Sequence, residues 1–197
     1  MKSKKKFFSI ITPILNNPDI EKVFKSLNSQ SFKNFEHIVV DGGSNKKTLK
    51  IINKNKKKIN KLIIEKDNGI YDAINKGIKV SNGKIIGVLN ADDYYYFNTL
   101  ELVHNYFKKD KIDYVFGSVL KNRLMHNFSP HKIWYKFNVY PAHSCGFFVK
   151  KKLHQNNNLG LYDLNFKYSS DRDFIYRLIN SNYKGKCAKK YEIFGRF

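Results

Sequence analysis

The sequence predicts an α/β protein built on a mostly parallel sheet that is flanked by helices. Three observations lead to this prediction. Short apolar runs alternate with amphipathic stretches through the first half of the 197-residue chain. Hydrophobic residues make up 42% of the chain and aromatic residues 15%, which is enough to bury the core of one domain. Carboxylates directly follow several of the apolar runs, at the place where open parallel sheets bind ligands.

The first half alternates between expected strands and expected helices. Apolar runs bounded by turn residues predict buried strands, and apolar residues three and four positions apart predict helices. Repeated strand–helix units predict parallel strands joined by right-handed crossovers. The expected strands are Phe7–Ile11, Phe35–Val40, Leu62–Ile64 and Ile85–Leu89, and the expected helices are Pro18–Gln30, Lys46–Lys58 and Ile70–Val80.

The second half is less regular. The aromatic segment Lys121–Pro141 has no clear period and is expected to form a hairpin with a loop. We expect one domain over residues 1–197, whose regular strand–helix part ends at about residue 97. The other expected elements are helices over Asn98–Phe107 and Asp171–Ile179 and strands over Asp113–Val119, Gly146–Val149 and Glu192–Phe197.

The chain is strongly basic, with 37 Lys and Arg residues against 16 acidic ones and a formal charge of +21. The lysines are dispersed, and no arginine-rich arm or RNA-binding signature accompanies them, so charge alone does not predict a specific nucleic-acid partner. Attraction to an anionic membrane surface is a further expectation, and a lysine-rich genome bias would give the same excess. The isolated Cys145 and Cys187 favour the reducing cytoplasm, and the basic charge agrees with a peripheral position at the inner face of the membrane.

Polar residues follow each expected strand of the first half. Thr12–Pro13 follow the first strand, Asp41 the second, Asp67 the third and Asp92–Asp93 the fourth. Because parallel strands share a carboxyl edge, these residues should converge on one crevice. Adjacent carboxylates repel each other unless a cation neutralises them, and Mg²⁺ or Mn²⁺ prefers carboxylate and phosphate oxygens. The pattern therefore predicts a nucleotide crevice, with simple turn formation as the alternative for Asp41 and for Asp92–Asp93.

Four motifs in this region resemble the family-2 glycosyltransferases, above all bacterial enzymes that build surface polysaccharide. The motifs are SIITP at 9–13, HIVVDGGS at 37–44, GIYDAINKG at 69–77 and the stretch 83–93 ending in LNADD. Their order and spacing make the resemblance specific, whereas the second half matches more loosely. The resemblance implies a Rossmann-like, A-type glycosyltransferase fold with a small acceptor-side region. It assigns nucleotide-sugar binding to the half that ends at about residue 97, and the acceptor side and catalytic base to the half from about residue 98. It also implies inverting transfer from a nucleoside-diphosphate sugar, with UDP favoured, to a glycan or lipid-linked glycan acceptor in cell-surface polysaccharide or glycolipid synthesis.

The same resemblance implies roles for the donor-side residues. Mn²⁺ or Mg²⁺ would be the cofactor, with Asp93 as the more direct ligand and Asp92 beside it. The donor-side residues are Thr12 and Pro13 lining the nucleoside pocket, Asp41 binding the base, Asp67 at the crevice, Asp72 near the donor sugar, and Asp92 and Asp93 at the metal. For Asp72, an ordinary surface position on a helix is the alternative.

The resemblance also places the catalytic base in an acidic pair at the start of a late helix. Asp171 is the expected base and Asp173 the second choice, with an ordinary N-cap as the alternative for Asp171. His143 resembles a position at the rim of the active site, where it would contact the acceptor or the diphosphate. A structural role is the alternative for His143.

Three other functions compete with this interpretation. A sugar nucleotidyltransferase has a similar architecture, but its glycine-rich, arginine-containing loop has no counterpart in residues 12–16. A basic nucleic-acid-binding protein would show steeply salt-dependent binding. A truncated, non-catalytic transferase is the third alternative, because the chain is short for the family and stops within an apolar run.

Overall fold

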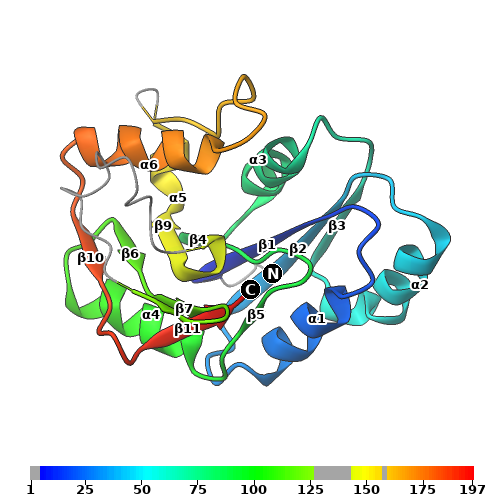
Figure 1. The fold of residues 1–197 in the computed structure, drawn as a ribbon, viewed down its shortest axis with the longest axis horizontal. Helices are drawn as coiled ribbons and strands as arrows, with labels where there is room; N and C mark the ends of the chain where they lie inside the picture. Colours follow the sequence, from blue (N-terminus) through cyan, green and yellow to red (C-terminus); the bar gives the residue numbers. More distant parts are fainter. Residues whose placement is uncertain (1–4, 127–142, 157–158) are drawn as a thin grey trace.

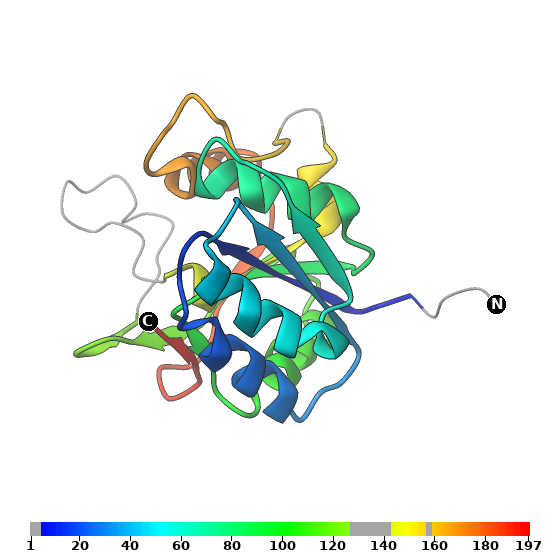
Figure 2. The same cartoon turned by 90° about the vertical axis from the view of Figure 1, so that its right-hand side faces the viewer.

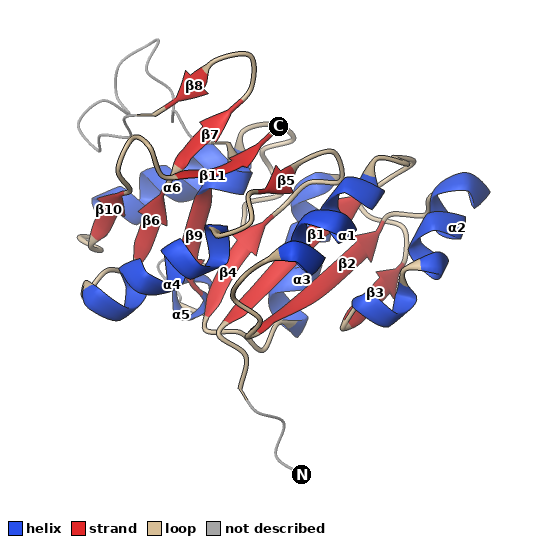
Figure 3. Cartoon of the chain, turned by 90° about the horizontal axis from the view of Figure 1, so that it is seen from below, coloured by secondary structure: helices blue, strands red, loops and turns tan. Residues whose placement is uncertain are grey.

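The computed structural model describes residues 5–126, 143–156 and 159–197. Two sheets form its centre, and Figure 3 shows the smaller sheet beyond one end of the larger. Across the larger sheet lie β10 (Gly185–Cys187), β6 (Tyr114–Phe116), β9 (Phe147–Lys150), β4 (Ile85–Val88), β1 (Phe8–Ile14), β2 (Phe35–Asp41) and β3 (Lys61–Ile64). Across the smaller lie β5 (Tyr94–Tyr95), β11 (Ile193–Arg196), β7 (Ser118–Leu120) and β8 (Leu124–Met125).

The predicted α/β fold with a mostly parallel sheet is confirmed. Strand β1 pairs in parallel with β2 and β4, and β2 pairs in parallel with β3. Among the strands that the structure describes in this sheet, only β9 runs against its neighbours, pairing antiparallel with β4 and β6. Both expected halves of the domain therefore contribute strands to one sheet.

Helices cover both faces of the large sheet (Figures 1 and 2). Their apolar side chains form two separate buried clusters, one on each face. One face carries α1 (Ile20–Ser29), α2 (Lys46–Lys54) and α4 (Thr99–Lys109), and the other carries α3 (Ile70–Val80), α5 (Lys151–His154) and α6 (Ser170–Asn180). Two short 3₁₀ turns, η1 (Lys56–Lys58) and η3 (Ser144–Gly146), complete the described helical segments.

Strand β1 is longer than the sequence suggested, because Thr12 and Pro13 lie within it rather than after it. Its pairing with β2 continues to Ile14, whereas its pairing with β4 stops at Ile11. The last bond on the β4 side runs from the Leu89 amide to the Ile11 carbonyl, at 2.9 Å. The next bond would need an amide hydrogen on Pro13, which proline lacks. The two strands therefore separate at their carboxyl ends.

The segment expected as a single strand over Asp113–Val119 is two strands in different sheets. The chain leaves the large sheet after β6 and enters the small one at β7, with Gly117 between them. The ring of Phe194 packs against Gly117 so closely that a Cβ there would lie 2.1 Å from it. Strand β8 pairs antiparallel with β7, which confirms the start of the expected hairpin, while residues 127–141 of that segment lie outside the described ranges.

The described helices are all too short or too polar to cross a membrane.

Candidate functional site

The ends of β2 and β3 bring Asp41 and Asp67 together. Asp41 is fully buried, and its two carboxylate oxygens accept hydrogen bonds from the Ser44 amide at 3.1 and 3.3 Å. Asp67 lies against the next turn, because a Cβ on Gly42 would be 2.3 Å from Asp67 Oδ2. The Gly69 amide donates to Asp67 Oδ1 at 3.0 Å. The convergence expected from the parallel strands is therefore present on this side of the site.

Thr12 and Pro13 lie deeper than expected for residues that line a pocket. Thr12 is fully buried on the α1 face of β1, and its hydroxyl lies 3.0 Å from Nε2 of His37. Burial lowers the pKa of His37 to about 3, so the ring is neutral and serves as a core partner for Thr12 and Phe24. Strand β1 therefore contributes to the crevice through the residues that extend past the end of β4, and not through the Thr12 hydroxyl.

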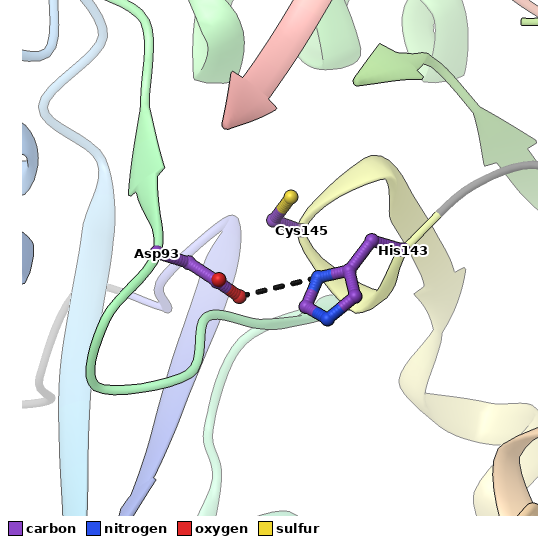
Figure 4. Close-up of side chains that lie close together, drawn as sticks. All are labelled: Asp93, His143 and Cys145. Atoms are coloured by element: carbon purple, nitrogen blue, oxygen red, sulfur yellow. Dashed lines mark ion pairs between the residues drawn. The ribbon is translucent and has the colours of Figure 1, made fainter. Parts of the chain in front are cut away.

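The two acids after β4 occupy different environments. Asp92 is exposed, whereas Asp93 is only 2% exposed and turns inward. Asp93 Oδ2 lies 3.3 Å from Nδ1 of His143, and it also accepts a hydrogen bond from the Asn90 amide at 3.3 Å (Figure 4). Burial raises the pKa of Asp93 above its ordinary value, and His143 opposes this shift.

Cys145 is the third member of this cluster and was not expected from the sequence. Ligand atoms of Asp93, His143 and Cys145 all lie within 4.8 Å of one another. Figure 4 shows that His143 and Cys145 come from the turn before β9, whereas Asp93 follows β4. Burial raises the pKa of the Cys145 thiol well above its ordinary value, so the thiol is protonated and is a poor metal ligand.

The remaining donors around Asp93 suit a divalent cation. A carboxylate oxygen and an imidazole nitrogen face each other, and both are ligands that Mn²⁺ accepts. The side-chain oxygen of Asn90 is also buried and has no hydrogen-bond partner among the described residues. An unsatisfied buried carbonyl of this kind needs a partner. Asp93 and His143 therefore form a donor pair that fits Mn²⁺ or Mg²⁺, and Asn90 and the exposed Asp92 lie on the same turn as Asp93.

A cavity of about 160 Å³ joins this cluster to the late helix α6. Its lining includes Asn90 and His143 together with Tyr71 and Asp171. The Tyr71 hydroxyl donates a hydrogen bond to Asp171 Oδ1 at 2.8 Å. Burial and the neighbouring Asp171 charge raise the pKa of Tyr71 to about 12, so the phenol keeps its proton and remains a donor. Residues from the first and second halves of the chain thus share one cavity.

Asp171 and Asp173 differ in what their carboxylates contact. Asp171 accepts hydrogen bonds on Oδ1 from Tyr71 and from the Arg172 amide, at 2.8 and 2.9 Å. Asp173 instead forms an ion pair with Arg177 at 2.8 Å, one turn along the helix. The N-cap of α6 is Ser169 rather than Asp171. Asp171 is therefore the member of the pair that faces the cavity.

Asp72 does not line this cavity, although Tyr71 beside it does. Its Oδ2 accepts a hydrogen bond from the Asn68 amide at 3.0 Å and pairs with Lys76 at 3.3 Å. These contacts, led by the Asn68 bond, lower the pKa of Asp72. Gly69 adopts φ +111° at the N-cap of α3, a conformation that favours glycine, and so fixes where this helix begins.

The comparisons with known proteins identify the family. The model of glycosyl transferase family 2 matches residues 9–186. The chain belongs to this family. Its membership confirms the resemblance seen in the four motifs and sets aside the sugar nucleotidyltransferase alternative. This family-2 glycosyltransferase also has relatives in distant organisms.

Two curated relatives show the breadth of the match. A PGL/p-HBAD biosynthesis glycosyltransferase of Mycobacterium bovis is 29% identical over 184 residues, which cover 88% of this chain and 70% of the relative. An uncharacterized glycosyltransferase of Rickettsia prowazekii is 30% identical over 185 residues, which cover 86% of this chain and 57% of the relative.

Solved structures share the fold at low identity. Staphylococcus aureus TarS in complex with UDP-GlcNAc has a TM-score of 0.77 and 19% identity, covering 97% of this chain and 58% of TarS residues in that structure. Mannosyltransferase PcManGT from Pyrobaculum calidifontis, in complex with GDP-Man and Mn²⁺, has a TM-score of 0.74 and 17% identity, covering 98% and 57% of the two chains. The fold is the A-type glycosyltransferase fold, and this chain spans less than two thirds of these solved chains.

Proposed function

We propose that this family-2 glycosyltransferase moves a sugar from a nucleoside-diphosphate sugar, with uridine as the favoured nucleoside, to an acceptor hydroxyl with inversion. The observation that carries the proposal is the cavity shared by the Asn90–His143 side and Asp171. It brings groups suited to a diphosphate next to a carboxylate suited to an acceptor. The complexes of similar proteins with UDP-GlcNAc and GDP-Man support a nucleotide-sugar donor.

Asp171 is the proposed base. In an inverting transfer, a carboxylate takes the proton from the acceptor hydroxyl as its oxygen attacks the anomeric carbon, and the bond to the diphosphate breaks on the opposite face. Tyr71 and the Arg172 amide hold Asp171 Oδ1. Within the described residues, no hydrogen bond reaches Oδ2. That oxygen is therefore available for the proton.

Asp93, His143 and Asn90 are the proposed residues that hold Mn²⁺ or Mg²⁺, with Asp92 at the exposed side. Such an ion, when bound, acts as a Lewis acid and stabilises the charge on the departing diphosphate. Asp41 and Asp67 are proposed to contact the nucleoside at the ends of β2 and β3. Asp72 is proposed to lie near the donor sugar at the start of α3, where its carboxylate accepts a hydrogen bond from the Asn68 amide.

The proposed acceptor is a glycan or a lipid-linked glycan used in cell-surface polysaccharide or glycolipid synthesis. The name of the mycobacterial relative supports a glycolipid pathway. A cytoplasmic protein that associates with the inner face of the membrane would meet such an acceptor, and the formal charge of +21 suits an anionic surface.

A thermal-unfolding panel tests the donor and the metal. Wild type is heated with UDP-sugars and GDP-sugars, with Mn²⁺ or with EDTA. A ligand at 100 times its Kd adds about 2.7 kcal/mol to the unfolding free energy, so binding should raise Tm by several degrees. We expect the rise with a UDP-sugar plus Mn²⁺ and its loss in EDTA and in Asp93→Ala.

The matched control is Asp19→Ala, which removes an exposed carboxylate at the N-cap of α1. It should keep the full ligand-dependent rise. A rise that survives in Asp93→Ala would refute the metal assignment, and no rise with any nucleotide sugar would refute the proposed donor class.

A further inference from the structure

A groove of about 700 Å³ lies where β1 and β4 begin, at the end of the large sheet opposite the candidate site. Its walls come from the residues before β1, the turn between α3 and β4, the end of α4 and the junction of β9 with α5. Strand β4 begins at this groove with Ile85, and the Asn90–Asp93 turn lies beyond its other end. At about 3.3 Å per residue, the strand keeps the two sites roughly 20 Å apart.

The antiparallel course of β9 gathers lysines at this groove. Because β9 runs against β4, its last residues arrive where β1 and β4 begin (Figure 3). Backbone hydrogen bonds fix the junction: the Lys84 amide donates to the Lys6 carbonyl at 3.3 Å, and the Lys151 amide donates to the Lys84 carbonyl at 2.8 Å. The lysines that line the groove are Lys5, Lys84, Lys150, Lys151 and Lys152.

The positive charge of the groove is only partly neutralised. None of the described residues that line it is acidic. Asp113 pairs with Lys150 at 3.0 Å and more distantly with Lys152 at 3.8 Å. In the described part of the chain, Lys5 and Lys84 form no ion pair.

Lys151 is the most constrained of these lysines. Its ammonium group donates to the Ser81 carbonyl. Burial lowers its pKa, and the nearby positive charges of Lys61 and Lys5 lower it further. Glu36 acts in the opposite sense, but its carboxylate also pairs with Lys61 at 3.6 Å and accepts from Ser9 at 2.6 Å. A half-buried cation with so little compensation is stabilised by an added anion.

We propose that this groove binds a phosphate-bearing anion. Several ammonium groups around one hollow suit a compact group with multiple negative oxygens, and lysine binds phosphate as a point charge. Phe7, Ile85 and Phe107 supply apolar wall next to the lysines, which suits a phosphate that carries an organic group. The site is separate from the proposed donor crevice, so the inference stands whether or not the proposed transfer is correct.

The test is direct binding by the purified chain. Sodium tripolyphosphate is titrated by calorimetry, and phosphatidylcholine vesicles with or without phosphatidylglycerol are used in a sedimentation assay. Each lysine beside an anionic surface contributes about a fivefold factor, so Lys84→Ala combined with Lys152→Ala should weaken binding by roughly 30-fold. Both side chains are exposed and lie on a fixed backbone, so the variant should fold, which circular dichroism verifies.

The matched control combines Lys56→Ala with Lys57→Ala, two exposed lysines on η1 that lie outside the groove. It removes the same charge and should change affinity by less than about threefold. Binding of tripolyphosphate identifies a free phosphate ligand, and binding only of the phosphatidylglycerol vesicles identifies a lipid headgroup. Equal losses in both variants, or no binding to either probe, would overturn the inference.

Discussion

Asp171 and Asp173 show how two carboxylates two positions apart on one helix acquire different properties. The carboxylate of Asp171 faces a cavity and is held by Tyr71, whereas that of Asp173 is held by Arg177. A base needs a free oxygen next to the acceptor, and an ion pair with arginine removes that freedom. The surroundings therefore favour Asp171 as the base.

Asparagine substitutions separate the two residues. Asp171→Asn should lower the rate of sugar transfer by at least about 100-fold, the scale of general-base catalysis, while nucleotide-sugar affinity stays within about threefold. Asp173→Asn should keep most activity and lose about 0.5 kcal/mol of stability, since it breaks one ion pair between successive helical turns. Radiolabelled-sugar transfer and urea unfolding measure the two effects. The opposite pattern of activity loss would assign the base to Asp173.

Tyr71, which the sequence did not single out, is proposed to position the Asp171 carboxylate. Tyr71→Phe removes its 2.8 Å hydrogen bond to Asp171 but keeps the ring against Tyr162. A hydrogen bond to a charged group contributes about 1.5–3 kcal/mol, so its loss from the base should lower kcat about tenfold or more. We expect the donor KM to stay nearly constant. Tyr168→Phe, which changes a tyrosine that is 77% exposed, is the control, and equal kcat values for both variants would exclude this role.

Asp93 should also give the ligand-free protein a characteristic pH dependence. Its folded pKa is raised, mainly by burial, so between its unfolded and folded pKa values the folded state binds more protons than the unfolded state. Stability should therefore fall as pH rises from about 4 through the folded pKa. Asp93→Asn should flatten this slope and raise the unfolding free energy at neutral pH in EDTA. Urea unfolding at a series of pH values measures it, and an unchanged slope would contradict the account.

At the scale of elements, α3 links the site to the loop before α6. Asn75, buried on α3, donates to the Tyr162 carbonyl at 2.8 Å and accepts from the Tyr162 amide at 3.0 Å. These two bonds place the Tyr162 ring beside Tyr71, which in turn contacts Asp171. The motif GIYDAINKG therefore acts as one element, because its tyrosine, Tyr71, and its asparagine, Asn75, both shape the wall of the same cavity.

Removing the Asn75 side chain should disturb both stability and the site. Asn75→Ala leaves two buried backbone groups of Tyr162 unpaired, which should cost about 2–3 kcal/mol of unfolding free energy. Transfer activity should fall as well, because the loop no longer fixes the wall of the cavity. Lys79→Ala, an exposed change on the same helix, is the control and should cost less than about 0.5 kcal/mol. A loss for Asn75→Ala no larger than the control would show that α3 does not hold this loop.

At the scale of the whole molecule, the candidate site lies where the order of the sheet reverses. From β1 the chain continues to β2 and β3 on one side, and β4 returns to the other side of β1. Ligands of open α/β sheets bind at such a switch point, outside the carboxyl ends of the strands. Pro13 contributes here by ending the bonds between β1 and β4.

The sequence alone predicted the part of this arrangement that local patterns encode. The first four strands and their helices follow from apolar periodicity, and the positions of Asp41, Asp67 and Asp93 follow from the shared edge of parallel strands. The small sheet could not be predicted, because β5 and β8 have two residues each and show no period. The break at Gly117 depends on Phe194, a residue distant in sequence.

Contacts between distant segments were the other part that patterns could not supply. No local sequence pattern indicates that His143 faces Asp93, since the pairing of β9 with β4 brings the two residues together. The contact between Tyr71 and Asp171 spans 100 positions in the sequence. The inward direction of Thr12 likewise depends on its partner His37 on the neighbouring strand.

Because β9 runs antiparallel to β4, it fixes the distance between the candidate site and the basic groove. The turn η3 joins His143 to the first residue of β9, and Lys150 is the last residue of the strand. One short segment therefore reaches the candidate site at one end and the basic groove at the other. Backbone hydrogen bonds to β4 on one side and β6 on the other hold β9 in a fixed position. Any surface or molecule that holds the groove would therefore present the transfer site at a fixed reach of roughly 20 Å, facing away from the point of attachment.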